Sequence, residues 1–281
     1  MIKFFCALLT ISTIFLYCST GKDLGIERPI NKSKQYLHLS HTRTKRNPLM
    51  DSLVEKVDYS KFDMLWLGGD LAYLTSRDDM TMAHIDSIFD VGNINTLWTL
   101  GNHDYSDLNR VKRYTKRPPY YAANQDGITL VVLDTQENLS NIADAQKDFL
   151  MGILDTVQKS SHLILLHHKL IWMYGNAHLE PKISSISNAR LGACSYCVNP
   201  NNFNSEIYPK LVEIKKKGVE VVCIGGDIGF HAKEFEYLTP EGIHFLASGI
   251  TYGQDENKAL LFQHNLSDKT LTWDFKQLND L

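Results

Sequence analysis

The chain has 281 residues, of which 43% are hydrophobic and 22% are charged. These values are typical of soluble globular proteins and exclude a disordered chain, a collagen-like repeat and a protein that crosses a membrane several times. The 29 basic and 32 acidic residues give a net charge of -3, so the composition carries no nucleic-acid-binding signal and no disordered acidic tail. The length allows one large domain or two small ones.

The first segment has the pattern of an export signal. Lys3 precedes an apolar run from Phe4 to Tyr17, which is about 14 residues long and too short to span a bilayer comfortably. Small residues follow, as at a cleavage site, so we predict a signal peptide over residues 1–20 and a secreted or periplasmic protein. An uncleaved membrane anchor is the alternative. Lipidation of Cys18 would also attach the chain to a membrane, although Tyr17 is bulky for a lipoprotein signal.

Short apolar runs recur after this segment, and each ends abruptly in polar or glycine-rich residues. The runs cover residues 36–39, 64–67, 96–100, 162–166 and 219–224. This is the pattern of strands buried on both faces of a sheet. Apolar residues at helical spacing lie between several of the runs, over residues 48–57, 79–89, 143–157 and 205–216. The alternation predicts an α/β fold with much parallel pairing.

The C-terminal part has a different pattern. Its apolar runs cover residues 235–238, 243–247, 259–264 and 270–275. Turn signals at residues 240–242 and 267–269 separate two pairs of these runs. They predict an antiparallel meander at the end of the α/β portion. The chain shows no internal repeat and no linker, so we expect a single domain over residues 35–281.

Three cysteines follow the N-terminal segment. Cys194 and Cys197 lie in the longest stretch without a clear pattern, residues 168–204, and their C-x-x-C spacing allows metal binding, redox chemistry or a small disulfide loop. A zinc site would need a second ligand pair at a suitable spacing, and the sequence has none. In an exported chain we expect a Cys194–Cys197 disulfide. Cys223 lies in an apolar run and is expected to be a small core residue.

Side chains that can bind metals follow five of the predicted strands. They are His41, Asp70, Asn102-His103-Asp104, His167-His168 and Asp227. Ligands of α/β sheets bind beyond the carboxyl ends of the strands, so these residues are expected to converge. One such residue is usually a turn or cap residue, but five strand ends together predict a site. Histidine nitrogen with Asp and Asn oxygen suits Zn, Mn or Fe.

The order of these residues resembles that of the calcineurin-like metallophosphoesterases. That family carries Asp-x-His, Gly-Asp, Gly-Asn-His-Asp/Glu, a lone His and Gly-His-x-His after successive strands. Here Gly69-Asp70, Gly101-Asn102-His103-Asp104 and His167 occur in the same order. The resemblance covers roughly residue 35 to the C-terminus. It implies a two-sheet sandwich flanked by helices, which the strands expected at the end of the chain fit.

The resemblance also implies a mechanism, in which two cations clamp a phosphate and activate a bridging water. Carried over to this chain, Asp70 bridges the two cations, and Asn102 and His167 bind one of them. His103 protonates the leaving group. Asp104 orients the His103 imidazole and raises its basicity.

Two motifs depart from the pattern of the family. His41-Thr42-Arg43 stands where Asp-x-His is expected, and Gly226-Asp227-Ile228-Gly229 stands where Gly-His-x-His is expected. His41 and Asp227 can still bind a cation, whereas the guanidinium of Arg43 has no lone pair to give. The first metal position therefore keeps too few ligands, and we expect one tightly bound divalent metal per chain.

Arg43 and His168 each have two interpretations that the sequence leaves open. The Arg43 guanidinium can bind phosphate with two parallel hydrogen bonds and so replace part of the missing ion, with Gly229 leaving it room. It can also turn to the surface beside a degenerate site. His168 follows the ligand position of His167 and is expected either to face the substrate or to be a polar loop residue.

Three functions compete. We favour an exported, metal-dependent phosphoester hydrolase, because a pure binding module has no need of the Asn102-His103-Asp104 motif. The altered first motif favours a catalytically weakened or inactive relative that binds a ligand or partner. A different metal-dependent hydrolysis on the same fold is the third candidate. The expected substrate is a small phosphoester or a phosphorylated molecule, and the sequence contains no nucleotide, sugar or lipid motif and does not indicate an oligomeric state.

Overall fold

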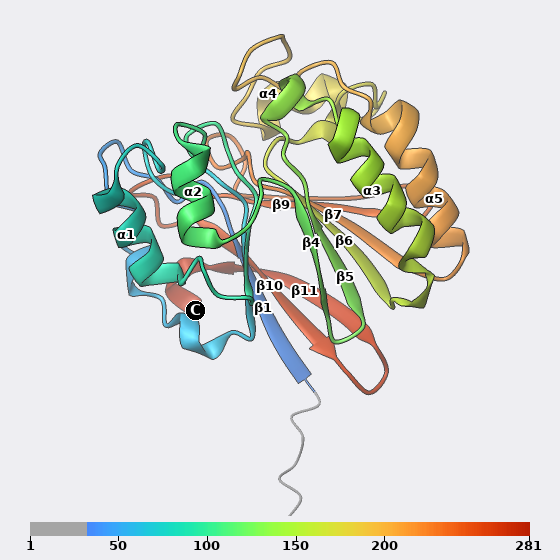
Figure 1. Ribbon diagram of the computed structural model, residues 1–281, viewed down its shortest axis with the longest axis horizontal. Coiled ribbons are helices and arrows are strands. Elements are labelled where there is room, and N and C mark those ends of the chain that lie inside the picture. The colour runs from blue at the N-terminus through green and yellow to red at the C-terminus, as the bar shows by residue number, and fades with distance from the viewer. Residues whose placement is uncertain (1–32) are drawn as a thin grey trace, which may run out of the picture. The chain divides into compact units, whose positions relative to one another are not determined.

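A computed structural model describes residues 33–281. In this part of the chain two β-sheets pack face to face, and helices cover both outer faces (Figure 1). The five-stranded sheet consists of β11 (Thr270–Gln277), β10 (Lys258–Asn265), β1 (Ser33–Leu39), β2 (Met64–Leu67) and β3 (Thr96–Trp98), in this order across the sheet. β1, β2 and β3 are parallel, and the hairpin of β10 and β11 adds an antiparallel edge next to β1.

The six-stranded sheet has the same mixed character. Its strands are β4 (Tyr121–Gln125), β5 (Ile128–Val132), β6 (His162–His167), β7 (Glu220–Gly225), β9 (His244–Ser248) and β8 (Glu234–Leu238), again in spatial order. β5, β6, β7 and β9 are parallel, whereas the edge strands β4 and β8 are antiparallel to their neighbours. The parallel strands of both sheets therefore end in loops that can share one functional edge.

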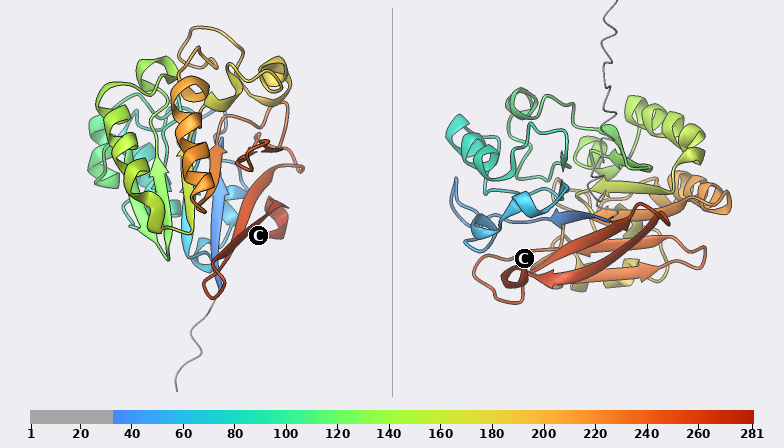
Figure 2. Two further views of the ribbon diagram at one scale, coloured as in Figure 1. Left: turned by 90° about the vertical axis from the view of Figure 1, so that its right-hand side faces the viewer. Right: turned by 90° about the horizontal axis from the view of Figure 1, so that it is seen from below.

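The described helices are α1 (Asp79–Phe89), α2 (Leu108–Thr115), α3 (Asp144–Thr156), α4 (Ile183–Ile186) and α5 (Tyr208–Lys216). In Figure 1, α1 and α2 lie on the side of the five-stranded sheet. In the left view of Figure 2, α3 and α5 face the viewer on the side of the six-stranded sheet. Side chains cap the first two helices: Asp78 accepts a hydrogen bond from the Thr81 N–H at 2.8 Å, and Asp107 accepts one from the Arg110 N–H at 3.0 Å.

Buried apolar side chains of the described residues form three clusters, one between the sheets and one under each helical layer. β6 shows how a strand serves two of them. Leu163 and Leu165 pack under the helices, whereas Ile164 and Leu166 pack between the sheets. This alternation follows from the two-residue period of a strand, and it explains why the sequence of β6 is apolar throughout.

The fold class predicted from the sequence is confirmed, with local differences. The sequence analysis did not predict α2, α4 or the hairpin of β4 and β5. Residues 48–57 were expected to form a helix but contain only a short 3₁₀ turn, Val54–Lys56. The Asp51 N–H donates to the Thr42 carbonyl at 2.8 Å, so this segment pairs with the loop after β1 in place of coiling on itself. The four predicted C-terminal strands are present, but they form two hairpins, one at an edge of each sheet, and not one continuous meander.

The predicted signal peptide over residues 1–20, with Cys18, lies outside the described residues. Its cleavage, and the domain boundaries at residues 20 and 35, stay predictions. Within residues 33–281, no helix combines the length and apolar character needed to cross a membrane.

Candidate active site

The loops after β1, β2, β3 and β7 meet around one cavity of about 190 Å³. Its lining consists of His41, Arg43, Asp70, Asn102, His103, Asn188, Tyr196, Asp227 and Phe230. Six of the nine were predicted as site residues from the sequence. The structure thus brings together side chains that are up to about 190 positions apart in the chain, as the position of the strand ends requires.

Glycines allow these loops to approach one another. A Cβ atom at Gly226 would lie 1.9 Å from the Gly68 carbonyl oxygen, and a Cβ atom at Gly101 would lie 2.1 Å from Oδ1 of Asp70. Side chains at these two positions would push the strand ends apart. His41 and Asp70 both have a left-handed backbone with φ of 56°, which is uncommon for residues other than glycine and is concentrated at functional sites.

The buried carboxylate of Asp70 is the centre of the site. Its Oδ1 lies 3.6 Å from Nε2 of His168, and its Oδ2 lies 3.7 Å from Nε2 of His41, 3.5 Å from Nε of Arg43 and 3.9 Å from Nε2 of His103. The His103 N–H donates to Oδ1 at 3.0 Å. Burial opposes ionisation of this carboxyl, but the positive charge that His168, His41 and His103 carry when protonated, together with this N–H, holds its pKa below the ordinary value.

In their neutral forms, two histidine rings present lone pairs to this carboxylate. Nδ1 of His168 lies 2.7 Å from the Gly68 carbonyl oxygen, and Nδ1 of His41 lies 3.0 Å from the Ile250 carbonyl oxygen. A carbonyl oxygen can only accept, so in the neutral rings each Nδ1 carries the hydrogen and each Nε2 is an acceptor. Burial lowers the pKa of His41 to about 3, which keeps this ring neutral. An acceptor nitrogen and a carboxylate oxygen repel each other, so this arrangement favours a cation between them.

Asp227 completes one side of this arrangement. Its Oδ1 lies 4.0 Å from Nε2 of His168, and burial raises its pKa to about 6. Nε2 of His168 is buried and has no hydrogen-bond partner among the described residues. The donor chemistry of His168, Asp70 and Asp227 therefore fits a divalent cation that prefers nitrogen and oxygen. As the side chains of residues 33–281 stand, however, no three His, Cys, Asp or Glu residues are arranged as a metal site.

His167, predicted as a metal ligand, lies away from Asp70. Its ring packs edge-on against Trp172 with 4.6 Å between centroids, and its Nδ1 lies 2.7 Å from the Lys169 carbonyl oxygen. His168 occupies the place that the sequence analysis gave to its neighbour. Side chains of a strand alternate between its two faces. His167 is therefore on the same face of β6 as Leu163 and Leu165, which pack under the helical layer.

Asp104, predicted to orient the His103 imidazole, has other partners. Its carboxylate accepts hydrogen bonds from the backbone N–H groups of Asp70, Leu71 and Gly101 at 2.7, 3.1 and 2.8 Å, and from the Thr75 hydroxyl. It therefore fixes the loop that carries Asp70. Nδ1 of His103 instead lies 2.5 Å from the Tyr73 carbonyl oxygen, which orients the ring with Nε2 toward the cavity.

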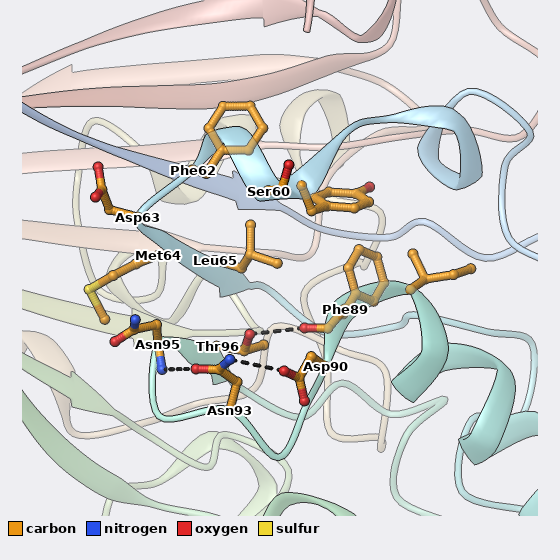
Figure 3. Close-up of a pocket in the computed structure, with 12 residues that line it drawn as sticks. Ser60, Phe62, Asp63, Met64, Leu65, Phe89, Asp90, Asn93, Asn95 and Thr96 are labelled. Atoms are coloured by element: carbon orange, nitrogen blue, oxygen red, sulfur yellow. Dashed lines mark hydrogen bonds between the residues drawn. The ribbon is translucent and has the colours of Figure 1, made fainter.

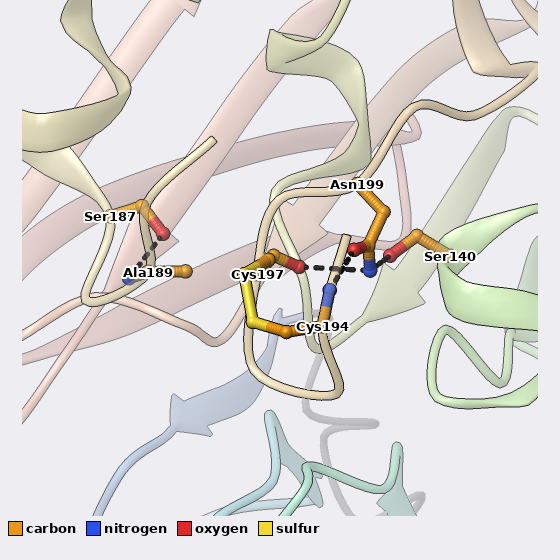
Figure 4. The surroundings of a disulfide bond; sticks show 6 residues. All are labelled: Ser140, Ser187, Ala189, Cys194, Cys197 and Asn199. Atoms are coloured by element: carbon orange, nitrogen blue, oxygen red, sulfur yellow. Dashed lines mark hydrogen bonds between the residues drawn. A yellow bond between two sulfur atoms is a disulfide. The ribbon is translucent and has the colours of Figure 1, made fainter. Parts of the chain in front are cut away.

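Three lining residues were not predicted as site residues: Asn188, Tyr196 and Phe230. The Phe230 N–H donates to Oδ1 of Asn188 at 2.7 Å. Tyr196 lies between Cys194 and Cys197, which form the predicted disulfide, and Figure 4 shows the surroundings of this bond. The aromatic residue between two cysteines was the sequence feature that could have indicated Tyr196. The sequence alone, however, does not show that this loop lies at the site.

Another cavity, of about 350 Å³, lies at the opposite ends of β2 and β3. Figure 3 shows its lining, which includes Met64, Leu65, Phe89 and Thr96. Thr96 donates a hydrogen bond to the Phe89 carbonyl oxygen at 2.9 Å, and Asn93 donates one to Asp90 at 2.9 Å. Other polar groups of the lining pair with residues outside it, as Asp63 does with Lys34 and Ser60 with Asp58, so this cavity offers no comparable chemistry.

Neither the protein-family models nor the curated proteins compared with the chain match it. Among solved structures, a dimetal phosphatase from Danio rerio matches with a TM-score of 0.52 and 11% identity, over 87% of this chain and 96% of that one. The fold is therefore of the metallophosphoesterase type. NAD nucleotidase from Haemophilus influenzae has a TM-score of 0.43 and 14% identity, over 86% of this chain and 49% of that one. The 5′-nucleotidase precursor from Thermus thermophilus has a TM-score of 0.41 and 11% identity, over 87% of this chain and 54% of that one. This chain spans about half the length of these two nucleotidases.

Proposed function

We propose that this chain hydrolyses phosphoester bonds with one divalent cation, Zn, Mn or Fe, held by Asp70, His168 and Asp227 with Asn102 beside them. The observation that carries the proposal is the unpaired Nε2 of His168, which faces Asp70 at 3.6 Å and Asp227 at 4.0 Å. A buried acceptor between two carboxylates is costly unless a cation joins them. His168 replaces His167 in the ligand set that the resemblance implied.

The cation would supply a positive charge that polarises the phosphoryl group and makes a water more acidic. Arg43 supplies a second, permanent charge on the other side of Asp70, where its Nε lies 3.5 Å from Oδ2. Its guanidinium also lies over the ring of Phe230, 5.7 Å from the ring centroid. A guanidinium so oriented can bind two phosphate oxygens in parallel. We propose that its positive charge binds the phosphate in place of the second metal ion.

His103 is suited to protonate the leaving group. Its Nδ1 donates to the Tyr73 carbonyl oxygen, so in the imidazolium form the proton available for transfer is on Nε2. This atom faces the cavity near Asp70, and the side chain is partly exposed, so a leaving group can reach it. Asp104 contributes indirectly, because it holds the backbone of Asp70 and Gly101 in place.

We also propose that the protein is exported. The disulfide between Cys194 and Cys197 supports this, since such bonds persist in oxidising compartments. The apolar N-terminal segment from Phe4 to Tyr17 supports it independently.

The test combines metal analysis with kinetics. Purified protein should hold about one divalent metal per chain and should turn over a phosphomonoester or a phosphodiester. His103→Ala should keep the metal and lower turnover by roughly 10²–10⁴-fold. Two tightly held metals per chain would contradict the one-metal centre, and unchanged turnover in His103→Ala would remove His103 from the mechanism.

A second candidate, a binding protein, is favoured by the lack of a complete metal arrangement among residues 33–281. Wild-type protein that binds inorganic phosphate but turns over no phosphoester, with or without added Zn, Mn or Fe, would support this candidate against the enzyme.

A further inference from the structure

Two large aromatic side chains flank the mouth of the candidate active site. Tyr196 is 51% exposed and Phe230 is 49% exposed, and both line the same cavity as Asp70. They come from distant parts of the chain, the disulfide loop and the loop after β7. Aromatic residues that stay this exposed beside a pocket are candidates for contact with a ligand.

The ring of Phe230 is held in place before any ligand arrives. It packs edge-on against His41, with 4.8 Å between centroids, and the Arg43 guanidinium lies over it. Its backbone N–H donates to Asn188. The ring therefore contacts His41 and Arg43 of the candidate active site, while about half of the residue stays exposed to solvent.

Tyr196 is held by the disulfide loop. The Cys197 N–H donates to the Cys194 carbonyl at 3.1 Å, and the Cys194 N–H donates to Oδ1 of Asn199 at 2.9 Å. The amide of Asn199 in turn donates to the Ser140 hydroxyl at 3.0 Å (Figure 4). Asn199 is buried, so the loop that presents Tyr196 is anchored at its base.

A further contact ties this loop to the catalytic residues. In the amide orientation that satisfies both of its ends, Gln136 donates to the Ser195 carbonyl at 3.0 Å and accepts from the Asn102 N–H at 3.3 Å. The position of Tyr196 is thereby linked to the loop that carries Asn102 and His103. Preorganised side chains lose little entropy when a ligand binds, which is what a specificity element requires.

The size of the cavity decides what reaches these rings. A volume of about 190 Å³ is larger than a phosphoryl group, so part of the remaining ester can enter the cavity as well. Because Tyr196 and Phe230 line the same cavity as Asp70 and are about half exposed, the group attached to the ester oxygen meets these two side chains as it leaves the cavity. Offset or edge-to-face contacts with a planar ring suit two aromatic walls better than a branched or charged group does.

We propose that Tyr196 and Phe230 form a subsite for a planar ring, so that the preferred substrates are phosphoesters with an aromatic or heteroaromatic group next to the ester oxygen. This inference rests on the proposed function, because it requires the phosphoryl group to lie against Asp70 and Arg43. Tyr196 is the residue to test, because Phe230 also supports His41 and Arg43.

The experiment compares benzyl phosphate with cyclohexylmethyl phosphate, which are similar in size and in leaving-group acidity but differ in the planarity and π-system of the ring. The wild type should have a KM roughly 3- to 10-fold lower for the benzyl ester, the range expected for one aromatic contact. Tyr196→Ala should remove this difference in KM between the two esters, and Tyr196→Phe should retain it. Inhibition by inorganic phosphate should not change in either variant.

Leu191→Ala is the matched control, because Leu191 is 47% exposed on the same loop but does not line the cavity. It should behave as the wild type. Equal KM values for the two esters in the wild type, or an equal rise for both in Tyr196→Ala, would overturn the subsite while leaving hydrolysis intact.

Absence of any turnover would instead overturn the proposed function, and the subsite is then tested by calorimetry with the corresponding benzyl and cyclohexylmethyl phosphonates. Tighter binding of the benzyl compound, lost in Tyr196→Ala, supports the ring subsite, and equal affinities overturn it.

Discussion

Nε2 of His168 lies 3.6 Å from Oδ1 of Asp70, and the opposite nitrogen of the same ring is committed to the Gly68 carbonyl. This contact joins the two sheets, because His168 follows β6 of the six-stranded sheet and Asp70 follows β2 of the five-stranded sheet. The candidate metal position therefore depends on the packing of the whole sandwich and not on one loop.

The first prediction separates the two adjacent histidines. His168→Ala should lose the bound metal and the activity, because it removes a nitrogen donor that faces Asp70 and Asp227. His167→Ala should keep the metal but lower the stability, because a buried ring that packs on Trp172 is removed. Elemental analysis and urea unfolding of both variants decide the question. Loss of metal in His167→Ala alone would restore the ligand that the sequence resemblance implied.

Much of the fold follows from local sequence patterns. The helix α1 was predicted with the bounds that it has, because Met82, Ile85 and Phe89 are at helical spacing. The hairpin of β4 and β5 was missed although Asp126-Gly127 is a typical two-residue turn, with both residues at positive φ. β4 is partly exposed and shows little apolar alternation, so its sequence gives no clear strand signal. β5 is a buried apolar run of the kind that predicts a strand, and it was missed without a physical reason.

The site was less predictable than the fold. Short motifs placed Asp70, Asn102 and His103 correctly at one cavity, because strand ends converge in this architecture. The choice between His167 and His168 depends on which ring points between the sheets, which requires the register of β6. Tyr196 reaches the cavity only through the tertiary path of a long loop, and no local pattern encodes that path.

The second prediction concerns Asp104 as an anchor of the site. Asp104→Asn leaves several buried N–H groups with one acceptor oxygen fewer, so the free energy of unfolding should fall by about 2–4 kcal/mol. Urea unfolding measures the loss. The matched control is Asp107→Asn, where asparagine caps α2 about as well as aspartate, and the stability should stay near that of the wild type. A stable Asp104→Asn variant whose only defect is a shifted pH–rate profile would favour the role of orienting His103.

The third prediction tests Arg43 as a phosphate-binding residue. Arg43→Ala should leave the metal content unchanged and weaken inhibition by inorganic phosphate roughly 10- to 100-fold, the value of a charge-assisted contact. Arg43→Lys should recover part of this loss, because the charge returns without the planar fork. The control is Arg46→Ala, an exposed arginine on the same loop that does not line the cavity. Equal phosphate inhibition in Arg43→Ala and the wild type would assign Arg43 to the surface.

The fourth prediction concerns acid stability and is independent of the proposed activity. His162 is buried at the start of β6, 6.2 Å from His264 between ring centroids. Burial and the neighbouring His264 lower the pKa of His162 to about 4, from 6.5 in the unfolded chain. Between these values the unfolded chain binds a proton that the folded chain does not. Protonation of His162 therefore favours the unfolded chain below pH 6.5. The free energy of unfolding has its full value above pH 6.5 and falls as the pH decreases toward 4.

His162→Gln removes this titration, so its stability should fall less steeply than that of the wild type between pH 6.5 and pH 4.5. Urea unfolding at several pH values measures both slopes. His178→Gln, which replaces an exposed histidine, is the control and should follow the slope of the wild type. His264 lies beside His162, and burial lowers its pKa as well, so a residual slope in His162→Gln is expected from this second ring. Parallel slopes for His162→Gln and the wild type would show that His162 is protonated as readily in the folded protein as in the unfolded chain.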